Sequence, residues 1–340
     1  MSTYKEIKGV GIQSFASDPT NPVLGQIWYN SNVGTFKVYN GTINVAAWAT
    51  GGNVNTARDR YATAGNGTQT SGLMFGGSPK DYLITESYNG SSWTEVNALN
   101  TGKNGPGAAG TSTAALAFGG YGIAPGDDEY SEWPQPLTES WNGTNWTEVN
   151  DMNRAASYLP GAGETNTAAL AFGGYPNHLG PTSPVALTES WNGTNWTEVN
   201  DMNLARIIHA GSGSSTAALS IGGGPVITAR TESWNGTNWT EVNDLNTGRD
   251  HLNAEGTQTA SIAFGGETGP TVPSDTGETE SWNGTNWTVI PATLNTARGG
   301  LRGAGTSTAA LAFGGQLGNG PGESVTEEFA GGAGPVTFDA

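Results

Sequence analysis

The sequence predicts an all-β fold, a six-bladed β-propeller preceded by a short N-terminal β anchor segment. One observation is a Phe-Gly-Gly or Ile-Gly-Gly marker that recurs every 43 to 54 residues, at Phe75, Phe118, Phe172, Ile221, Phe264 and Phe313. A second is a Glu-Ser-aromatic-Asn-Gly block centred on Tyr88, Trp141, Trp191, Trp234 and Trp282, with degenerate copies at Tyr39 and Phe329. A third is the 53 glycines, which leave no helical periodicity longer than a turn. Repeats of this length with four short strands each are typical of propeller blades. We therefore expect an attachment segment over residues 1–35 and the propeller over residues 36–340.

Each unit is expected to contribute four strands in a fixed order. The first is rich in Gly and Ala, as in residues 301–305, and follows a turn of the type Asn-Thr-Ala-Arg. The second is apolar and ends at two glycines, as in residues 307–315. The third and fourth are Thr-Glu-Ser-Trp and Trp-Thr-Glu-Val, as in residues 138–141 and 146–149. Thr, Trp and Val favour pleated, half-buried positions, so these segments predict strands.

The turn between the third and fourth strands contains Asn142-Gly143, a strong signal for a two-residue type I′ hairpin loop. Such a loop would place Trp141 opposite Thr144 and Glu139 opposite Trp146, and the two tryptophans would be diagonal neighbours. The two-residue period of a strand then puts four side chains on one face, those of Glu139, Trp141, Trp146 and Glu148.

Two interpretations of the repeated tryptophans stay open. In one, each tryptophan fills the gap between two blades and buries on the order of 150–250 Å². In the other, it stacks on a sugar beside a carboxylate, and the site is repeated around the ring. The near-identity of the copies favours packing, because every gap between blades has the same shape. The expected structural residues are Trp141, Trp146, Trp191, Trp196, Trp234, Trp239, Trp282 and Trp287.

The connections from strand two to strand three are expected to form the recognition surface. Strands alternate in direction, so these connections share one face of the propeller with those from strand four to the next strand one. They differ in every unit, over residues 78–84, 121–137, 175–187, 224–230, 267–278 and 316–325, while the other turns barely change. Variation on a constant frame is typical of binding loops. The binding candidates are Tyr121, Asp127, Asp128, Glu129, Tyr130, Trp133, Tyr175 and His178. Asp127, Asp128 and Glu129 match no defined calcium loop, and neither a metal nor another cofactor is predicted.

A basic residue follows the connection from strand four to strand one in five units, where the chain reaches the axial channel. These residues are Arg58, Lys103, Arg206, Arg249 and Arg298, and Ala156 takes the position in the remaining unit. Two interpretations stay open here as well. The five cations form a basic ring at the channel mouth that binds an anion, or each one caps backbone carbonyls within its own blade, which we favour.

The last blade must be closed by a strand from elsewhere, because an open strand edge invites aggregation. The sixth unit supplies three strands and ends at Phe329. A fourth strand is available from residues 42–50, which contain Trp48, or from residues 335–338 near the C-terminus. Trp48 precedes the first Asn-Thr-Ala-Arg turn as the other fourth-strand tryptophans do, so we favour the N-terminal segment.

Composition narrows the classes of function. With no cysteine among 340 residues, disulfides, thiolate metal sites and thiol nucleophiles are excluded. The net charge of −17, from 13 basic and 30 acidic residues, argues against nucleic acid or an anionic membrane as the main partner. The first residues are too polar for a secretory signal or a membrane span, so we expect synthesis in the cytoplasm and no membrane span.

The repeat resembles the Kelch repeat over about residues 53–329. Gly119-Gly120, Trp141 and Trp146 stand where that motif has its double glycine, its aromatic residue and its tryptophan. The interval of five residues between the last two is shorter than the usual Kelch spacing, which points to a divergent branch. The resemblance implies a Kelch-like propeller.

The segment before the array resembles a short β segment of bacteriophage tail fibres and other virion appendages. The likeness is carried by Gly25, Ile27, Trp28, Tyr29, Asn30, Phe36, Lys37, Val38, Tyr39 and Gly41. It implies attachment to other virion proteins through residues 1–35, or trimerisation. The alternative is a hairpin that packs on the propeller.

Three functions follow from these observations. The first is a non-enzymatic virion protein, as a tail fibre, a tail-associated protein or a capsid decoration, that presents the propeller to a host-surface glycan or protein as a homo-oligomer on the particle. The second is an intracellular Kelch adaptor for a partner protein. The third is a sialidase-like enzyme, which needs an arginine triad and a tyrosine nucleophile on the channel face. Repeats without an evident catalytic set favour the first.

Overall fold

A computed structural model describes residues 13–17, 19, 26–32, 34–38, 46–78, 83–123, 133–176, 184–269 and 274–331. Over these residues the secondary structure consists of strands and turns without helix, which confirms the predicted all-β class. The chain divides into two compact units, Met1–Val45 with Gly332–Ala340, and Ala46–Gly331. The expected strand at residues 335–338 lies outside the described residues.

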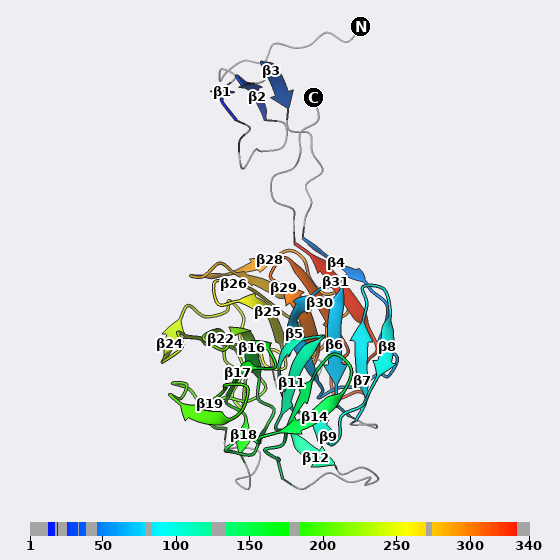
Figure 1. The fold of residues 1–340 in the computed structure, drawn as a ribbon. Coiled ribbons are helices and arrows are strands. Elements are labelled where there is room, and N and C mark those ends of the chain that lie inside the picture. Colours follow the sequence, from blue (N-terminus) through cyan, green and yellow to red (C-terminus); the bar gives the residue numbers. More distant parts are fainter. Residues whose placement is uncertain are drawn as a thin grey trace. The chain divides into compact units, whose positions relative to one another are not determined.

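The larger unit is a propeller of six four-stranded antiparallel sheets, counted over the described residues, as the sequence predicts (Figure 1). Blade 1 contains β5 (Ala62–Thr68), β6 (Ser71–Phe75), β7 (Thr85–Tyr88) and β8 (Trp93–Val96). Blade 2 contains β10 (Gly107–Thr111), β11 (Ala114–Phe118), β13 (Thr138–Trp141) and β14 (Trp146–Val149). Blade 3 contains β16 (Gly161–Thr165), β17 (Ala168–Phe172), β19 (Thr188–Trp191) and β20 (Trp196–Val199). Blade 4 contains β21 (Ala210–Ser214), β22 (Ala217–Ile221), β23 (Thr231–Trp234) and β24 (Trp239–Val242). Blade 5 contains β25 (Asn253–Thr257), β26 (Ala260–Phe264), β27 (Thr279–Trp282) and β28 (Trp287–Ile290). Blade 6 contains β29 (Arg302–Thr306), β30 (Ala309–Phe313), β31 (Thr326–Ala330) and β4 (Ala47–Thr50).

The innermost strands surround the axis of the propeller. Each packs against the innermost strands of the two neighbouring blades, in the order β5, β10, β16, β21, β25 and β29, and β29 returns to β5. Their Ala and Gly residues allow this close approach, because six strands must converge on one axis. The buried apolar side chains form six clusters, each between two neighbouring blades. The core therefore consists of six interfaces between neighbouring blades, which we call joints.

Every joint contains the same hydrogen bond, and five of the six also share an aromatic contact. The tryptophan of the fourth strand donates its indole N–H to the first threonine of the third strand in the preceding blade, as Trp239 Nε1 does to Thr188 Oγ1 at 3.0 Å. In five joints its ring also packs on the aromatic residue of the Gly-Gly marker, as Trp239 does on Phe172 at 4.9 Å between centroids. The tryptophans with this hydrogen bond are Trp48, Trp93, Trp146, Trp196, Trp239 and Trp287. The packing interpretation of the repeated tryptophans is the one that the structure shows.

The predicted register of the outer hairpin is wrong by two residues, since it placed Trp141 opposite Thr144. Trp141 pairs directly with Trp146, and Glu139 pairs with Glu148, so the loop has four residues. The cause is the side chain of Asn142, whose Oδ1 accepts hydrogen bonds from the backbone N–H groups of Thr144 and Asn145 at 2.9 Å. An Asn side chain that folds onto the backbone in this way stabilises a wider turn. The two indole rings lie 5.3 Å apart between centroids, as direct cross-strand neighbours.

The sixth blade takes its fourth strand from the N-terminal side of the propeller. β4 pairs antiparallel with β31, and Trp48 lies opposite Phe329. Trp48 Nε1 donates to Thr279 Oγ1 of blade 5 at 3.0 Å, the same joint that the other fourth strands make. The N-terminal alternative for ring closure is therefore the one observed.

The smaller unit contains a three-stranded sheet. β1 (Gln13–Phe15) runs parallel to β2 (Ile27–Asn30), which pairs antiparallel with β3 (Thr35–Val38). Trp28 is fully buried in this unit. No helix of the described residues has the length and apolar character needed to cross a membrane.

Candidate functional site

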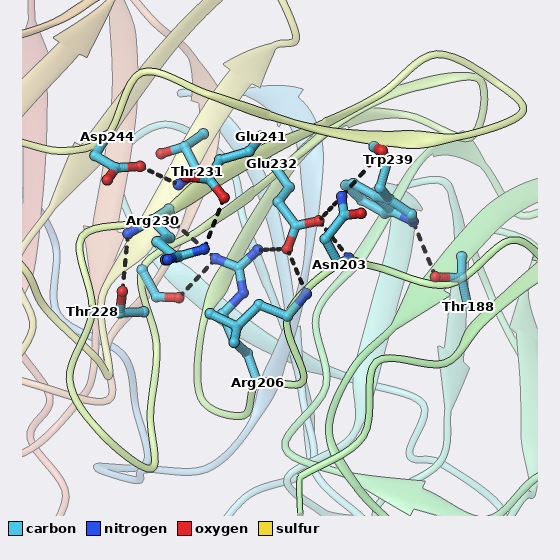
Figure 2. Close-up of polar contacts among 12 residues, drawn as sticks. Thr188, Asn203, Arg206, Thr228, Arg230, Thr231, Glu232, Trp239, Glu241 and Asp244 are labelled. Carbon is cyan, nitrogen blue, oxygen red and sulfur yellow. Dashed lines mark hydrogen bonds and ion pairs between the residues drawn. The ribbon is translucent and has the colours of Figure 1, made fainter.

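The predicted basic residues belong to a buried frame that repeats in the blades. Figure 2 shows this frame in blade 4, where Arg206 Nη2 donates to Glu232 Oε1 at 2.8 Å and Nη1 donates to the carbonyls of Gly222 and Arg230. The other oxygen of Glu232 accepts hydrogen bonds from the backbone N–H and the side-chain amide of Asn203, at 2.7 and 2.8 Å. Burial lowers the pKa of Arg206, and the neighbouring carboxylate of Glu232 opposes that shift. Through these hydrogen bonds the frame fixes the segment that connects blades 3 and 4 to the third strand of blade 4.

The basic ring at the channel mouth is not observed. All five side chains are fully buried and donate to groups of their own blade, so they cannot meet a ligand at the surface. Lys103 donates to the carbonyl of Leu137 at 2.9 Å, and burial lowers its pKa to about 8 while the neighbouring Glu139 opposes the shift. The carbonyl-capping interpretation holds for Arg58, Lys103, Arg206, Arg249 and Arg298.

A different set of residues surrounds the mouth of the axial channel. It stands two positions after each basic position, and every member has a positive φ, from 51° to 64°. The backbone N–H of one member donates to the carbonyl of the preceding one, for example from Ile208 to Tyr158 at 3.1 Å and from His251 to Ile208 at 3.0 Å. We call this set the mouth ring: Arg60, Gly105, Tyr158, Ile208, His251 and Gly300.

The mouth ring keeps side chains where its backbone favours glycine. Two blades have Gly at this position, yet four have Arg60, Tyr158, Ile208 and His251. A left-handed conformation costs a non-glycine residue about 1–2 kcal/mol. Strained residues of this kind cluster at functional sites. These four side chains line a pocket of about 230 Å³, together with Asp59, Arg302 and Gln316.

Two residues that line this pocket, Arg60 and His251, lie beside carboxylates. Arg60 Nε lies 3.4 Å from Asp59 Oδ2, and His251 Nδ1 lies 3.2 Å from Asp250 Oδ1 and 3.8 Å from Glu267 Oε1. Burial raises the pKa of Glu267, and the nearby carboxylates of Asp250 and Asp275 add to the shift. Asp250, His251 and Glu267 each offer one ligand atom within 4.8 Å of the others, an arrangement of imidazole and carboxylates that can hold a divalent metal ion.

Two of the predicted loop tyrosines pack on Tyr158, which lines this pocket. The rings of Tyr121 and Tyr175 each lie 6.0 Å from that of Tyr158 between centroids, with edge-on geometry. Burial raises the pKa of Tyr175, and Tyr121 adds to the shift. Trp133 is 42% exposed. The other predicted loop residues, Asp127, Asp128, Glu129, Tyr130 and His178, lie outside the described residues.

The first residues of the variable loops join the mouth by backbone pairing. In each blade the residue after the Gly-Gly marker pairs with the residue just before the mouth ring, as Tyr175 does with Ser157 and Glu267 with Asp250. The variable 2–3 connections and the mouth ring therefore lie at the same end of the propeller. This is the face on which the sequence places recognition.

A second cavity, of about 70 Å³, lies between the innermost strands. Its walls are mostly Ala, Gly and Pro, with seven polar side chains among them, and four of the seven break the repeat. Arg302 stands where other blades have Ala62, Gly107, Pro160, Ala210 and Asn253, and Glu255 stands where they have Ala or Ser. His209 takes a position that is Leu in three blades, at Leu159, Leu252 and Leu301. The four repeat-breaking residues of this axial cavity are His209, Asn253, Glu255 and Arg302.

Sequence reasoning missed these four residues because it compared the loops and not the innermost strands. The available signal was a polar residue at a position that is small or apolar in most of the other units. Burial shifts the pKa of His209 well below its usual value and that of Glu255 well above it, so both favour their uncharged forms. Arg302 is the arginine of this cavity, and its guanidinium carries a positive charge.

Comparison of the sequence with protein-family models and with curated proteins finds no match.

Proposed function

We propose that this protein is a non-enzymatic recognition propeller of a bacteriophage particle, which binds a host-surface glycan at the mouth of its axial channel. The observation that carries the proposal is the mouth ring, in which four blades keep a large or polar side chain in a backbone conformation that two blades relieve with glycine. A frame built only for stability has no reason to retain that strain at four positions.

The chemistry of the mouth suits a sugar. Tyr158 offers an aromatic ring to the pocket, supported by Tyr121 and Tyr175 behind it, and Arg60, Asp59 and Gln316 offer hydrogen-bonding groups around the same pocket. Most residues that line the pocket are polar, and such groups can hydrogen-bond the hydroxyls of a sugar.

The resemblance of residues 25–41 to virion appendage segments supports placement on a particle, and the order of repeat motifs supports a divergent Kelch-like origin. Binding without catalysis is supported by the position of the five basic side chains, which are committed to their own blades.

The test uses substitutions that the propeller already tolerates elsewhere. Tyr158→Gly and His251→Gly introduce the residue that blades 2 and 6 have at the same position. We expect both variants to fold and to lose binding on a glycan array, because the glycine removes only the side chain. Thr237→Ala, in an exposed turn between strands three and four, is the matched control and should bind as the unchanged protein does.

Two outcomes oppose the proposal. Unchanged glycan binding by both glycine variants would move the site away from the mouth. Absence of the protein from purified phage particles, with a cellular protein bound at the mouth instead, would favour the adaptor function.

A further inference from the structure

The axial cavity contains a cation without an acidic partner. Arg302 makes one side-chain hydrogen bond among the described residues, from Nη1 to the carbonyl of its neighbour Leu301 at 3.2 Å. No carboxylate of the described residues lies within ion-pair distance of it, in contrast to the buried arginines of the frame such as Arg249, 2.9 Å from Glu280. A guanidinium has five N–H donors in a planar fork, so most of its capacity is unused here.

A buried histidine adds a second unused polar group. His209 is 3% exposed, and neither ring nitrogen has a hydrogen-bond partner among the described residues. Leaving a buried polar group without a partner costs about 1–3 kcal/mol. Leucine, which three other blades have at this position, would avoid that cost. His209 and Arg302 both line the axial cavity.

The remaining polar groups of the cavity do not neutralise Arg302. Asn253 donates from Nδ2 to Glu255 Oε1 at 2.8 Å. Glu255 accepts this bond, and among the described residues no ion pair joins Glu255 to Arg302. Farther along the axis, the amide of Asn66 donates to the carbonyls of Gly163 and Gly213 across the channel. The cavity thus complements one negative charge.

Arg302 connects the cavity with the outside, because it lines both the axial cavity and the mouth pocket. A volume of about 70 Å³ accommodates a few atoms, since a water molecule occupies about 30 Å³ of liquid. The mouth pocket, at about 230 Å³, accommodates more. These two volumes fit a ligand with a small anionic end in the axial cavity and a larger polar body in the mouth pocket.

We propose that the axial cavity binds the carboxylate of an acidic sugar, held by Arg302 with Asn253 and His209 beside it, while the sugar ring lies in the mouth pocket. This inference rests on the proposed glycan recognition and names the ligand class as uronic-acid glycans. Arg302 binds the two carboxylate oxygens through its planar fork, a geometry that Lys cannot reproduce.

The test compares two probes that differ at one carbon. Methyl β-glucuronide carries a carboxylate where methyl β-glucoside carries a hydroxymethyl group. Calorimetric titration of the full chain should show binding of the glucuronide, and binding of the glucoside at least about tenfold weaker. Sodium acetate and sodium chloride are tested in parallel, and acetate should bind while chloride at the same concentration should not.

Three variants make the test specific. Arg302→Ala and Asn253→Ala place at each position a residue that blades 1 and 4 have there, and each should reduce glucuronide affinity at least about tenfold. Thr237→Ala is again the control, because this residue lies in an exposed turn between strands three and four and outside the variable connections. His209→Leu identifies the ring signal of His209 in the NMR spectrum, which contains only three histidines, and that signal should shift when acetate is added to the unchanged protein.

The proposal fails if glucuronide and glucoside bind alike, if Arg302→Ala and Asn253→Ala bind glucuronide as the unchanged protein does, or if chloride shifts the His209 signal as much as acetate. Its failure is distinguishable from failure of the proposed function. Loss of neutral-glycan binding in Tyr158→Gly with no effect of Arg302→Ala would keep the recognition role and remove the carboxylate site. If acetate binds but the protein binds no glycan and is absent from phage particles, the carboxylate site stands and the proposed recognition function fails.

Discussion

A substitution at Gly300 of the mouth ring measures the cost of the left-handed backbone without a change in side-chain packing. Its φ is 64°, and a Cβ added there would meet nothing closer than Gln316 Cγ at 3.9 Å. Gly300→Ala should therefore lower the free energy of unfolding by about 1–2 kcal/mol through backbone strain alone. Denaturant unfolding measures this, with Gly269→Ala as the control, because Gly269 has no atom within 4 Å and no positive φ. Equal stability of the two variants would contradict the strain assigned to the mouth ring.

His209 and Glu255 predict opposite dependences of stability on pH. Because folding lowers the pKa of His209 from 6.5, its stabilising contribution is complete above that value and is lost as the pH falls below it. Because folding raises the pKa of Glu255 from 4.5, its contribution is complete below that value and declines as the pH rises above it. His209→Leu should flatten the slope below pH 6.5, and Glu255→Ala should flatten the slope above pH 4.5. Melting temperatures across this range measure both, and slopes that survive both substitutions would assign the titration to other groups.

Blade 3 differs from the other blades by one missing element of the frame. Ala156 takes the basic position, so Glu189 accepts hydrogen bonds from the backbone N–H and the side-chain amide of Asn153 and from the backbone N–H of Arg154, but among the described residues from no buried cation. A small cavity remains there, lined by Ala156, Glu189 and the segment around Gly173. Its walls correspond to the groups that hold Arg206 in blade 4.

Ala156→Arg should therefore restore the frame in blade 3. The new guanidinium would meet Glu189 and the carbonyls of Gly173 and Leu187, and we expect the free energy of unfolding to rise by about 0.5–2 kcal/mol. Ala156→Met fills the same space without the charge and is the matched control. If methionine stabilises as much as arginine, the gain comes from volume and not from the ion pair.

At the scale of the blade, sequence periodicity predicted most of what was found. The markers around Phe118 and Trp141 set the number and order of strands because both residues take part in the joints between blades. The hairpin register could not be obtained from the Asn-Gly pair, since the hydrogen bonds of the Asn142 side chain select a longer loop. The axial cavity was missed for a different reason, because a pattern of repeats emphasises what recurs and Arg302 occurs once.

The propeller as a whole is a closed ring, and this predicts that its terminal strand matters as much as an internal one. Trp48 and Trp196 are 6% and 5% exposed, and each packs on a marker phenylalanine at 4.9 and 5.0 Å between centroids. Trp48→Ala and Trp196→Ala should both lower the free energy of unfolding by about 3–5 kcal/mol. Thermal unfolding of the two variants measures this. A much smaller effect of Trp48→Ala would mean that the closing strand frays without loss to the ring.

The closure of the sixth blade also sets an order of events during synthesis. Trp48 and Trp93 leave the ribosome early, but their hydrogen-bond acceptors, Thr279 and Thr326, are made near the end of the chain. Blades 2 to 5 can each dock on the blade made just before. Blade 1 must wait with one apolar side uncovered until blade 6 arrives, and a nascent propeller of this kind is exposed to aggregation and to chaperones for most of its translation.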